Sequence, residues 1–187
     1  MIFILDFRVQ ITSVVTVSVF AIYIIAGTRP KGLLDSSDPL GLVGWMVVLV
    51  GLLFRSWAAG VLHKEHKLAT IGPYSLTRHP LYMGTLLSSF GFAILLSQPG
   101  FYAIIMAMFL LVYMPKLRQE EKKMAAKFGD EWEAFKKMTF MFFPRRFPPR
   151  MACPWQLSQW LHNKEYRAVA PGAILLALLE ILHRNPL

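Results

Sequence analysis

Long apolar runs separated by short polar segments dominate this chain. The first run, Val9 to Gly27, is apolar apart from hydroxyls and Gln10, and the second extends from Pro39 to Gly60. Two more follow, from Pro80 to Ser97 and from Phe101 to Met114. Because a helix rises 1.5 Å per residue, about 20 apolar residues cross a hydrocarbon core of about 30 Å. The pattern therefore predicts membrane-spanning helices.

The third and fourth runs are joined by Gln98-Pro99-Gly100, which predicts a tight turn and an antiparallel hairpin. Pro115 is expected to end the fourth helix, because proline removes a backbone donor and crowds the preceding turn. This hairpin places residues 63–78 and everything after Pro115 on the same face of the membrane.

Two further segments complete the pattern. Lys116 to Met138 mixes apolar and charged positions, which predicts an exposed amphipathic helix broken at Gly129-Asp130. Ala168 to His183 is a short apolar run that predicts a fifth transmembrane helix, with a packed or re-entrant helix as the alternative. We therefore expect an all-α, polytopic membrane protein with about five spans and one cytosolic amphipathic helix. It would form one domain over 1–187.

Composition supports a membrane location. The 187 residues are 55% hydrophobic, too apolar for an ordinary soluble domain of this size, and carry a net charge of +9. The basic residues lie between apolar runs, which favours an anionic lipid surface over nucleic acid. Cys153 is the single cysteine, so the sequence predicts a buried or interfacial thiol and excludes an internal disulfide and a cysteine-rich metal site. The N-terminus lacks a signal-peptide pattern and predicts a retained first span.

The distribution of lysine and arginine predicts the orientation. With five spans, Arg8, the 61–78 loop and the 115–167 region share one side and hold sixteen of the 20 lysines and arginines. By the positive-inside rule this side is cytoplasmic, so the N-terminus is expected inside and the C-terminus outside an inner membrane.

Polar and turn-forming residues gather in one stretch, His63 to Gly84. Pro80 suits the first position of a helix, where its missing N–H costs nothing. An anion at that helix start would meet free backbone N–H groups, the positive helix end and Arg78. Taken alone, Arg78 reads equally well as an interfacial charge, and His63 with His66 is a weak pattern for a metal site.

Glu120 and Glu121 lie on the same predicted face as this stretch. Adjacent side chains on a helix point about 100° apart, so one carboxylate can face a site while the other pairs with a lysine. A carboxylate at the mouth of the hairpin could hold ribose hydroxyls or a cationic centre. The alternative is a solvated charged face.

Three motifs in this order resemble a known family. They are E-H-K-L-A-T-I-G-P-Y-S-L-T-R-H-P-L-Y-M-G at 65–84, R-Q-E-E at 118–121 and K-F-G-D-E-W-E-A-F-K-K at 127–137. The combination resembles the integral-membrane isoprenylcysteine carboxyl methyltransferases and the related phospholipid methyltransferases. The resemblance covers about 60–145, taken as the cofactor-binding core, and does not extend to the helix expected at about 168–183.

The resemblance implies that S-adenosylmethionine binds at the cytosolic face without a Rossmann fold, and that its methyl group passes to a lipid or lipid-modified acceptor in the bilayer. Arg78, Glu120 and Glu121 would be the catalytic residues. An R-H-P motif also occurs in sterol-reductase-type membrane enzymes, and a non-catalytic protein of the same fold is a third alternative. The implied cofactor-binding residues are His66, Leu68, Gly72, Tyr74, Arg78, His79, Pro80, Tyr82, Glu120 and Glu121.

Overall fold

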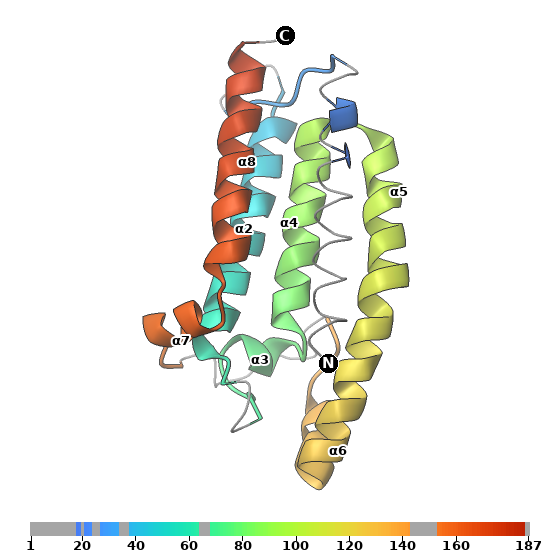
Figure 1. Ribbon diagram of the computed structural model, residues 1–187, viewed down its shortest axis with the longest axis vertical. Helices are drawn as coiled ribbons and strands as arrows, with labels where there is room; N and C mark the ends of the chain where they lie inside the picture. Colours follow the sequence, from blue (N-terminus) through green and yellow to red (C-terminus); the bar gives the residue numbers. More distant parts are fainter. Residues whose placement is uncertain are drawn as a thin grey trace.

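The computed structural model describes residues 18–19, 21–23, 27–33, 38–63, 68–142 and 153–185. Over these ranges the chain forms helices and no strand (Figure 1). The prediction of an all-α fold is therefore confirmed. The helices are α2 (Leu40–Val61), α3 (Pro73–Leu76), α4 (Pro80–Leu96), α5 (Pro99–Met108), the π-helical turn η1 (Phe109–Tyr113), α6 (Met114–Met138), α7 (Leu157–His162) and α8 (Tyr166–Arg184).

Three helices in the described part of the chain are long and apolar enough to cross a membrane. They are α2 with 22 residues, α8 with 19, and the continuous helix Pro99–Met138 with 40, while α4 is a shorter apolar helix. α2 and α8 match two predicted spans, and the chain is a polytopic membrane protein as expected. The first predicted span, Val9 to Gly27, lies largely outside the described residues.

The long helices lie along one axis, and neighbours in sequence are antiparallel. In Figure 1, α2, α4, α5 and α8 run along the long axis, and the short helices α3 and α7 lie near one end. The N-terminus of α4 lies at this end, which we call the site end, and α6 continues α5 beyond it. The part of this helix before Gly129 has about 30 residues and is about 45 Å long, more than the thickness of a hydrocarbon core of about 30 Å, so its charged end extends past the membrane.

Glycines bring α2 and α4 into close contact. A Cβ added at Gly51 of α2 would lie 2.5 Å from the backbone nitrogen of Ser88 and 2.7 Å from the carbonyl oxygen of Gly84. A Cβ at Gly91 of α4 would lie 2.6 Å from the backbone nitrogen of Val48. Small residues are the usual means by which helices approach in a membrane. The glycines of α2 therefore allow close contact with α4.

Gly51→Ala is expected to lower the stability of the protein in detergent by about 1–3 kcal/mol, because the added methyl group meets backbone atoms that cannot rotate away. Gly100→Ala is the matched control, since a Cβ there meets nothing within 4 Å. Thermal unfolding of both variants checks this. Equal melting temperatures for the two variants would contradict the close packing.

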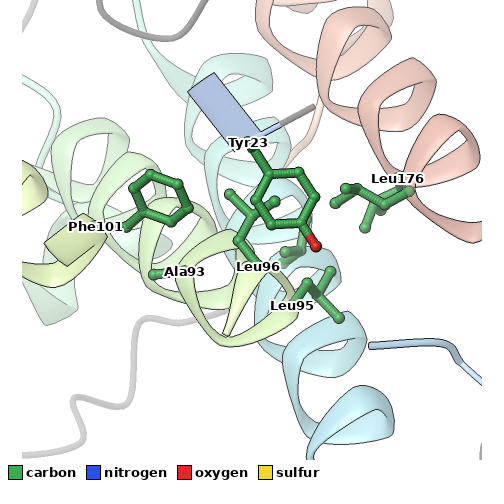
Figure 2. Packing of buried hydrophobic residues seen from close by; sticks show 8 residues of the cluster. Tyr23, Ala93, Leu95, Leu96, Phe101 and Leu176 are labelled. Atoms are coloured by element: carbon green, nitrogen blue, oxygen red, sulfur yellow. The ribbon is translucent and has the colours of Figure 1, made fainter. Parts of the chain in front are cut away.

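The buried apolar core lies toward the end of the bundle opposite the site. Tyr23 packs against Phe101 with ring centroids 6.3 Å apart, and Leu95, Leu96 and Leu176 surround it (Figure 2). Side chains facing outward are also apolar, as expected where lipid replaces water. On α2 these exposed residues include Leu42, Val43, Met46, Leu49, Val50 and Leu53.

Pro115 does not end the helix, and this prediction was wrong. The chain continues from α5 through η1 into α6 without a break. In an α-helix the ring of Pro115 would crowd the carbonyl of Leu111, and no N–H would bond to it. The π-turn widens the backbone there, and the N–H of Met114 donates to the carbonyl oxygen of Phe109, five residues back.

The predicted break at Gly129 is confirmed. Gly129 has φ 49° and ψ −121°, a conformation that residues with a side chain rarely adopt, and it kinks α6. After the kink, Trp132 and Phe135 are buried, whereas most neighbouring charged residues are exposed. The final turns of α6 are thereby directed back toward the start of α4.

Candidate functional site

A glycine turn and a four-residue helix lead into the site. Gly72 has φ 59°, and a Cβ there would also collide with the Sγ of Cys153, so the position requires glycine in two respects. α3 follows at once, and Pro80 then begins α4. The backbone N–H groups of Tyr82 and Met83 both donate to the carbonyl oxygen of His79, at 3.1 and 3.0 Å. This folds the polar segment tightly against the helix start.

Arg78 connects the start of α4 with α6. Its Nε donates to Oε1 of Glu121 at 2.9 Å, and its Nη1 donates to the carbonyl oxygens of Thr139 at 2.8 Å and Lys136 at 3.2 Å. Its backbone N–H donates to the carbonyl oxygen of Phe140 at 3.0 Å. Nη2 has no hydrogen-bond acceptor among the described residues. The guanidinium therefore fixes α6 to the site and keeps one nitrogen for another group.

Glu121 accepts from two site residues. Its Oε1 lies 2.9 Å from Nε of Arg78 and 3.2 Å from Nε2 of His79, whose side chain is mostly buried. The hydrogen bond from His79 and the charge of Arg78 hold the pKa of Glu121 below its ordinary value, against the opposing effect of burial. Glu121 lies beyond the apolar half of its helix and stays ionised at neutral pH.

Glu120 accepts a hydrogen bond from the hydroxyl of Tyr82 at 2.7 Å. Tyr82 also packs edge-to-face on His79 and on Tyr113, with ring centroids 5.9 and 5.8 Å apart. Both acids thus turn toward the start of α4. The sequence left open that one of them pairs with a lysine; in the structure His79 donates to Glu121 and Tyr82 donates to Glu120.

Tyr74 is buried, and its hydroxyl has no hydrogen-bond partner among the described residues. Burial raises the pKa of Tyr74, and the Glu165 carboxylate adds to the rise. The phenol therefore stays neutral and keeps an unused donor. A buried hydroxyl without a partner is costly, so the position fits a bound polar group.

In the described ranges of the chain, the other predicted cofactor-binding residues are not joined to this cluster by side-chain hydrogen bonds. Pro80 and Gly72 are buried in the turn and the helix start, and Leu68 is half-buried on the loop before them. His66 lies outside the described residues. Arg78, His79, Tyr82, Glu120 and Glu121 are brought together by hydrogen bonds, although the two groups lie some forty residues apart in the sequence.

An apolar cavity begins beside this cluster. It has a volume of about 150 Å³ and lies between α4 and the α5–η1 helix. Tyr82 and Tyr113 belong both to its wall and to the aromatic contacts beside Glu120. The sequence interpretation missed this cavity, whose signal on α4 is a face repeating every three or four residues. That face consists of Tyr82, Thr85, Leu86, Ser89, Phe92, Ala93 and Leu96.

A buried ion pair was also missed. Arg55 of α2 and Glu165 before α8 lie 2.7 Å apart between Nε and Oε1. A charged residue inside an apolar run needs a partner, which was the available signal. No group of three or more potential metal-ligating side chains occurs in the ranges that the structure describes.

Comparison with known proteins finds a match to the part of the chain that carries the candidate site. Residues 42–126 match the model of the isoprenylcysteine carboxyl methyltransferase (ICMT) family. The match runs from α2 into α6 and leaves α7 and α8 outside. No solved structure matches the chain at a significant level.

Three curated relatives are similar to this chain. The cobalt-zinc-cadmium resistance protein CzcN of Cupriavidus metallidurans is 35% identical over 108 residues, 57% of this chain and 48% of that protein. The nickel-cobalt-cadmium resistance protein NccN of Alcaligenes xylosoxydans xylosoxydans is 32% identical over 133 residues, 70% of this chain and 62% of that protein. The protein-S-isoprenylcysteine O-methyltransferase of Schizosaccharomyces pombe is 29% identical over 91 residues, 49% of this chain and 39% of that protein.

The chain thus spans 39% to 62% of the length of these relatives. The matched segment 42–126 contains the start of α4 and the Glu120–Glu121 pair, the two groups of residues that form the candidate site. The resemblance inferred from the motifs is confirmed, because residues 42–126 match the isoprenylcysteine carboxyl methyltransferase family.

Proposed function

We propose that this protein is an S-adenosylmethionine-dependent methyltransferase that acts on an acceptor embedded in the membrane, in the manner of the ICMT family. The supporting observation is that a polar side-chain cluster and an apolar cavity lie next to each other. A polar cluster of Arg78, His79 and the Glu120–Glu121 pair adjoins an apolar cavity, and Tyr82 takes part in both. Such a junction suits a polar donor and an apolar acceptor.

The polar cluster fits the chemical groups of S-adenosylmethionine. Nη2 of Arg78 would hold the carboxylate of its methionine moiety, the acids would accept hydrogen bonds from its ribose, and Tyr74 offers a buried hydroxyl. The negative charge of Glu120 and Glu121 also suits a cationic ligand. When bound, the cofactor supplies a methyl group activated by a positively charged sulfur.

The residues of this chain would contribute alignment and exclusion of water. The apolar wall between α4 and α5 would hold the hydrocarbon part of the acceptor, with its reactive end beside Tyr82 and Tyr113. Holding two reactants in line replaces a bimolecular encounter and lowers the barrier substantially. A carboxylate acceptor needs no base, whereas an amine acceptor requires a proton acceptor, a role open to His79 or Glu120.

The acceptor class follows from the cavity and the family. An isoprenylcysteine carboxylate is the first choice, because a lipid chain with a terminal acid matches an apolar cavity that ends in a polar cluster. The amine of a phospholipid is the second. We place the site on the cytoplasmic side of an inner membrane, with the binding core at about 60–145 in a single domain, because the basic residues gather at that face.

Ligand binding to the full-length protein in detergent tests the proposal. Calorimetry with S-adenosylhomocysteine should give a dissociation constant in the micromolar range, and reduced nicotinamide dinucleotide should not bind. Binding of the nicotinamide cofactor alone would favour a sterol-reductase-type enzyme. The names of CzcN and NccN associate those relatives with metal resistance, so silence toward both cofactors would favour a non-catalytic role of that kind.

The acceptor is identified by incubating membranes that contain the protein with methyl-labelled S-adenosylmethionine. Label in a base-labile ester on lipidated protein supports the carboxylate acceptor, and label in phospholipid supports the amine. Membranes with the Glu121→Gln variant provide the background. Equal labelling of both membranes would contradict the site.

A further inference from the structure

Arg55 and Glu165 form a two-pronged ion pair inside the bundle. Nε of Arg55 donates to Oε1 of Glu165 at 2.7 Å, and Nη2 donates to Oε2 at 3.0 Å. The Glu165 side chain is only 4% exposed and that of Arg55 21%. Parallel hydrogen bonds of this kind fix direction as well as distance. The pair therefore defines where the Arg55 guanidinium lies.

The remaining nitrogen of Arg55 reaches α4. Its Nη1 donates to Oγ1 of Thr85 and lies 3.4 Å from the carbonyl oxygen of Leu81. The Thr85 hydroxyl in turn donates to the same Leu81 carbonyl at 3.0 Å. One guanidinium thus connects α2, the segment before α8 and the first turns of α4.

The contact on α4 lies beside the candidate site. Leu81 directly precedes Tyr82, whose hydroxyl binds Glu120, and Thr85 lines the apolar cavity together with Tyr82. Arg55 therefore supports the wall at the place where the cavity meets the polar cluster. A shift of this turn would move the Tyr82 hydroxyl with it.

Glu165 is carried by a segment fixed to the end of α2. The side chains of Trp155 and Trp160 donate to the carbonyl and the hydroxyl of Ser56, at 3.0 and 2.8 Å. Asn163 donates to the carbonyl oxygen of Ala59 at 2.7 Å. The contact with Ala59, together with the backbone N–H of Gln156 on the carbonyl oxygen of Gly60 at 3.1 Å, satisfies acceptors that the end of α2 otherwise leaves open. The segment lies outside the matched range 42–126.

We propose that Glu165 is a positioning residue: it holds Arg55 against the first turns of α4 and thereby sets the place of Tyr82 between the cofactor site and the cavity. The inference rests on the proposed function and adds to it a role for the C-terminal segment. A purely stabilising role would be met equally well by apolar side chains, because replacing a buried ion pair with such residues is often neutral or stabilising. What apolar residues cannot supply is the directed contact with Thr85 and Leu81.

The double variant Arg55→Met/Glu165→Leu separates the two roles in the full-length protein. It removes both charges together, so no unpaired buried charge remains. We expect a melting temperature close to the wild-type value and at least about tenfold weaker binding of S-adenosylhomocysteine, the size of effect that the loss of one hydrogen bond in the cofactor site produces. Lys31→Met/Asp38→Leu, which removes the ion pair at the opposite end of the bundle, is the matched control and should bind normally.

A second measurement does not depend on the proposed activity. The chain has six tyrosines, so 3-fluorotyrosine labelling gives a short ¹⁹F spectrum in which Tyr82 is assigned by its loss in Tyr82→Phe. The Tyr82 resonance should shift in the double variant and stay unchanged in the control. If wild-type protein binds no S-adenosylhomocysteine, the proposed function fails and this resonance alone decides the inference.

An unchanged Tyr82 resonance in the folded double variant would overturn the inference. Glu165→Gln provides a second, milder variant, because its amide preserves one acceptor for Arg55 and replaces the other by a donor. It should give a smaller shift in the same direction. Failure of both variants to fold would also overturn the inference, since the pair would then be required for the fold itself.

Discussion

Glu121→Gln is expected to weaken binding of S-adenosylhomocysteine by roughly 10- to 100-fold, because a hydrogen bond to a charged group contributes about 1.5–3 kcal/mol. The carboxylate accepts from both Arg78 and His79 at a single oxygen. The amide oxygen of glutamine can accept the same two donors, but without the negative charge that strengthens both hydrogen bonds and holds the Arg78 guanidinium in place. Calorimetry on the full-length protein in detergent measures the change.

Glu133→Gln is the matched control on the same helix. Glu133 is exposed, and its contact with Lys136 is 3.9 Å long, so an effect within about twofold is expected there. An equal loss in both variants would point to a general electrostatic effect of α6. Unchanged binding in Glu121→Gln would remove Glu121 from the site.

The depressed pKa of Glu121 gives this prediction a pH dependence. The carboxyl of the unfolded chain titrates near 4.5, and that of the folded protein titrates lower. The contribution of the Glu121 ion pairs to stability is therefore fully present above pH 4.5 and is lost as the pH falls through the folded value. The difference in melting temperature between wild type and Glu121→Gln should stay constant above pH 5 and shrink only below pH 4.5.

Ser89→Phe is expected to abolish methyl transfer to a lipid acceptor while leaving the affinity for S-adenosylhomocysteine within a few fold of wild type. Ser89 lines the apolar cavity on α4, and an aromatic ring there would occupy a large part of its 150 Å³. The polar cluster lies at the end of the cavity and is not touched. Transfer of labelled methyl groups and calorimetry, measured on the same preparation, test the two halves of the prediction.

Ala103→Phe is the comparison variant for the cavity. Ala103 is an exposed residue of α5 and is absent from the cavity wall, so its larger side chain should be accommodated by lipid. Full transfer activity in Ser89→Phe would show that the acceptor enters elsewhere. Loss of cofactor binding in Ser89→Phe would mean that the cavity and the polar cluster are one pocket.

Local chemistry explains what the sequence predicted well. Pro80 and Pro99 mark helix starts because a missing N–H is harmless only there, and both helices begin at these residues. The hairpin between them follows, and with it the prediction that Arg78 and the Glu120–Glu121 pair share a face. The hydrogen bond from Arg78 to Glu121 supports that shared face.

The features that were missed depend on contacts between distant segments. The carbonyl oxygens that bind Arg78 come from Lys136 and Thr139, and the partner of Arg55 is 110 residues away. No periodicity encodes such pairings. The cavity was missed for a related reason, because unfilled volume is set by side chains from several helices at once. The prediction that Pro115 ends the helix failed because proline disrupts a regular α-helix, whereas the backbone forms a wider π-turn just before Pro115.

That π-turn also determines which side chains meet the start of α4. It accommodates one residue more than an α-helical turn, and each residue corresponds to about 100° of rotation about the helix axis. Deleting one residue from η1 would advance the register of α6 by one position, so that Lys122 would face Arg78 where Glu121 does now. The extra residue in the π-turn thus determines the rotation of α6 about its axis, and with it which side chains of α6 face α4.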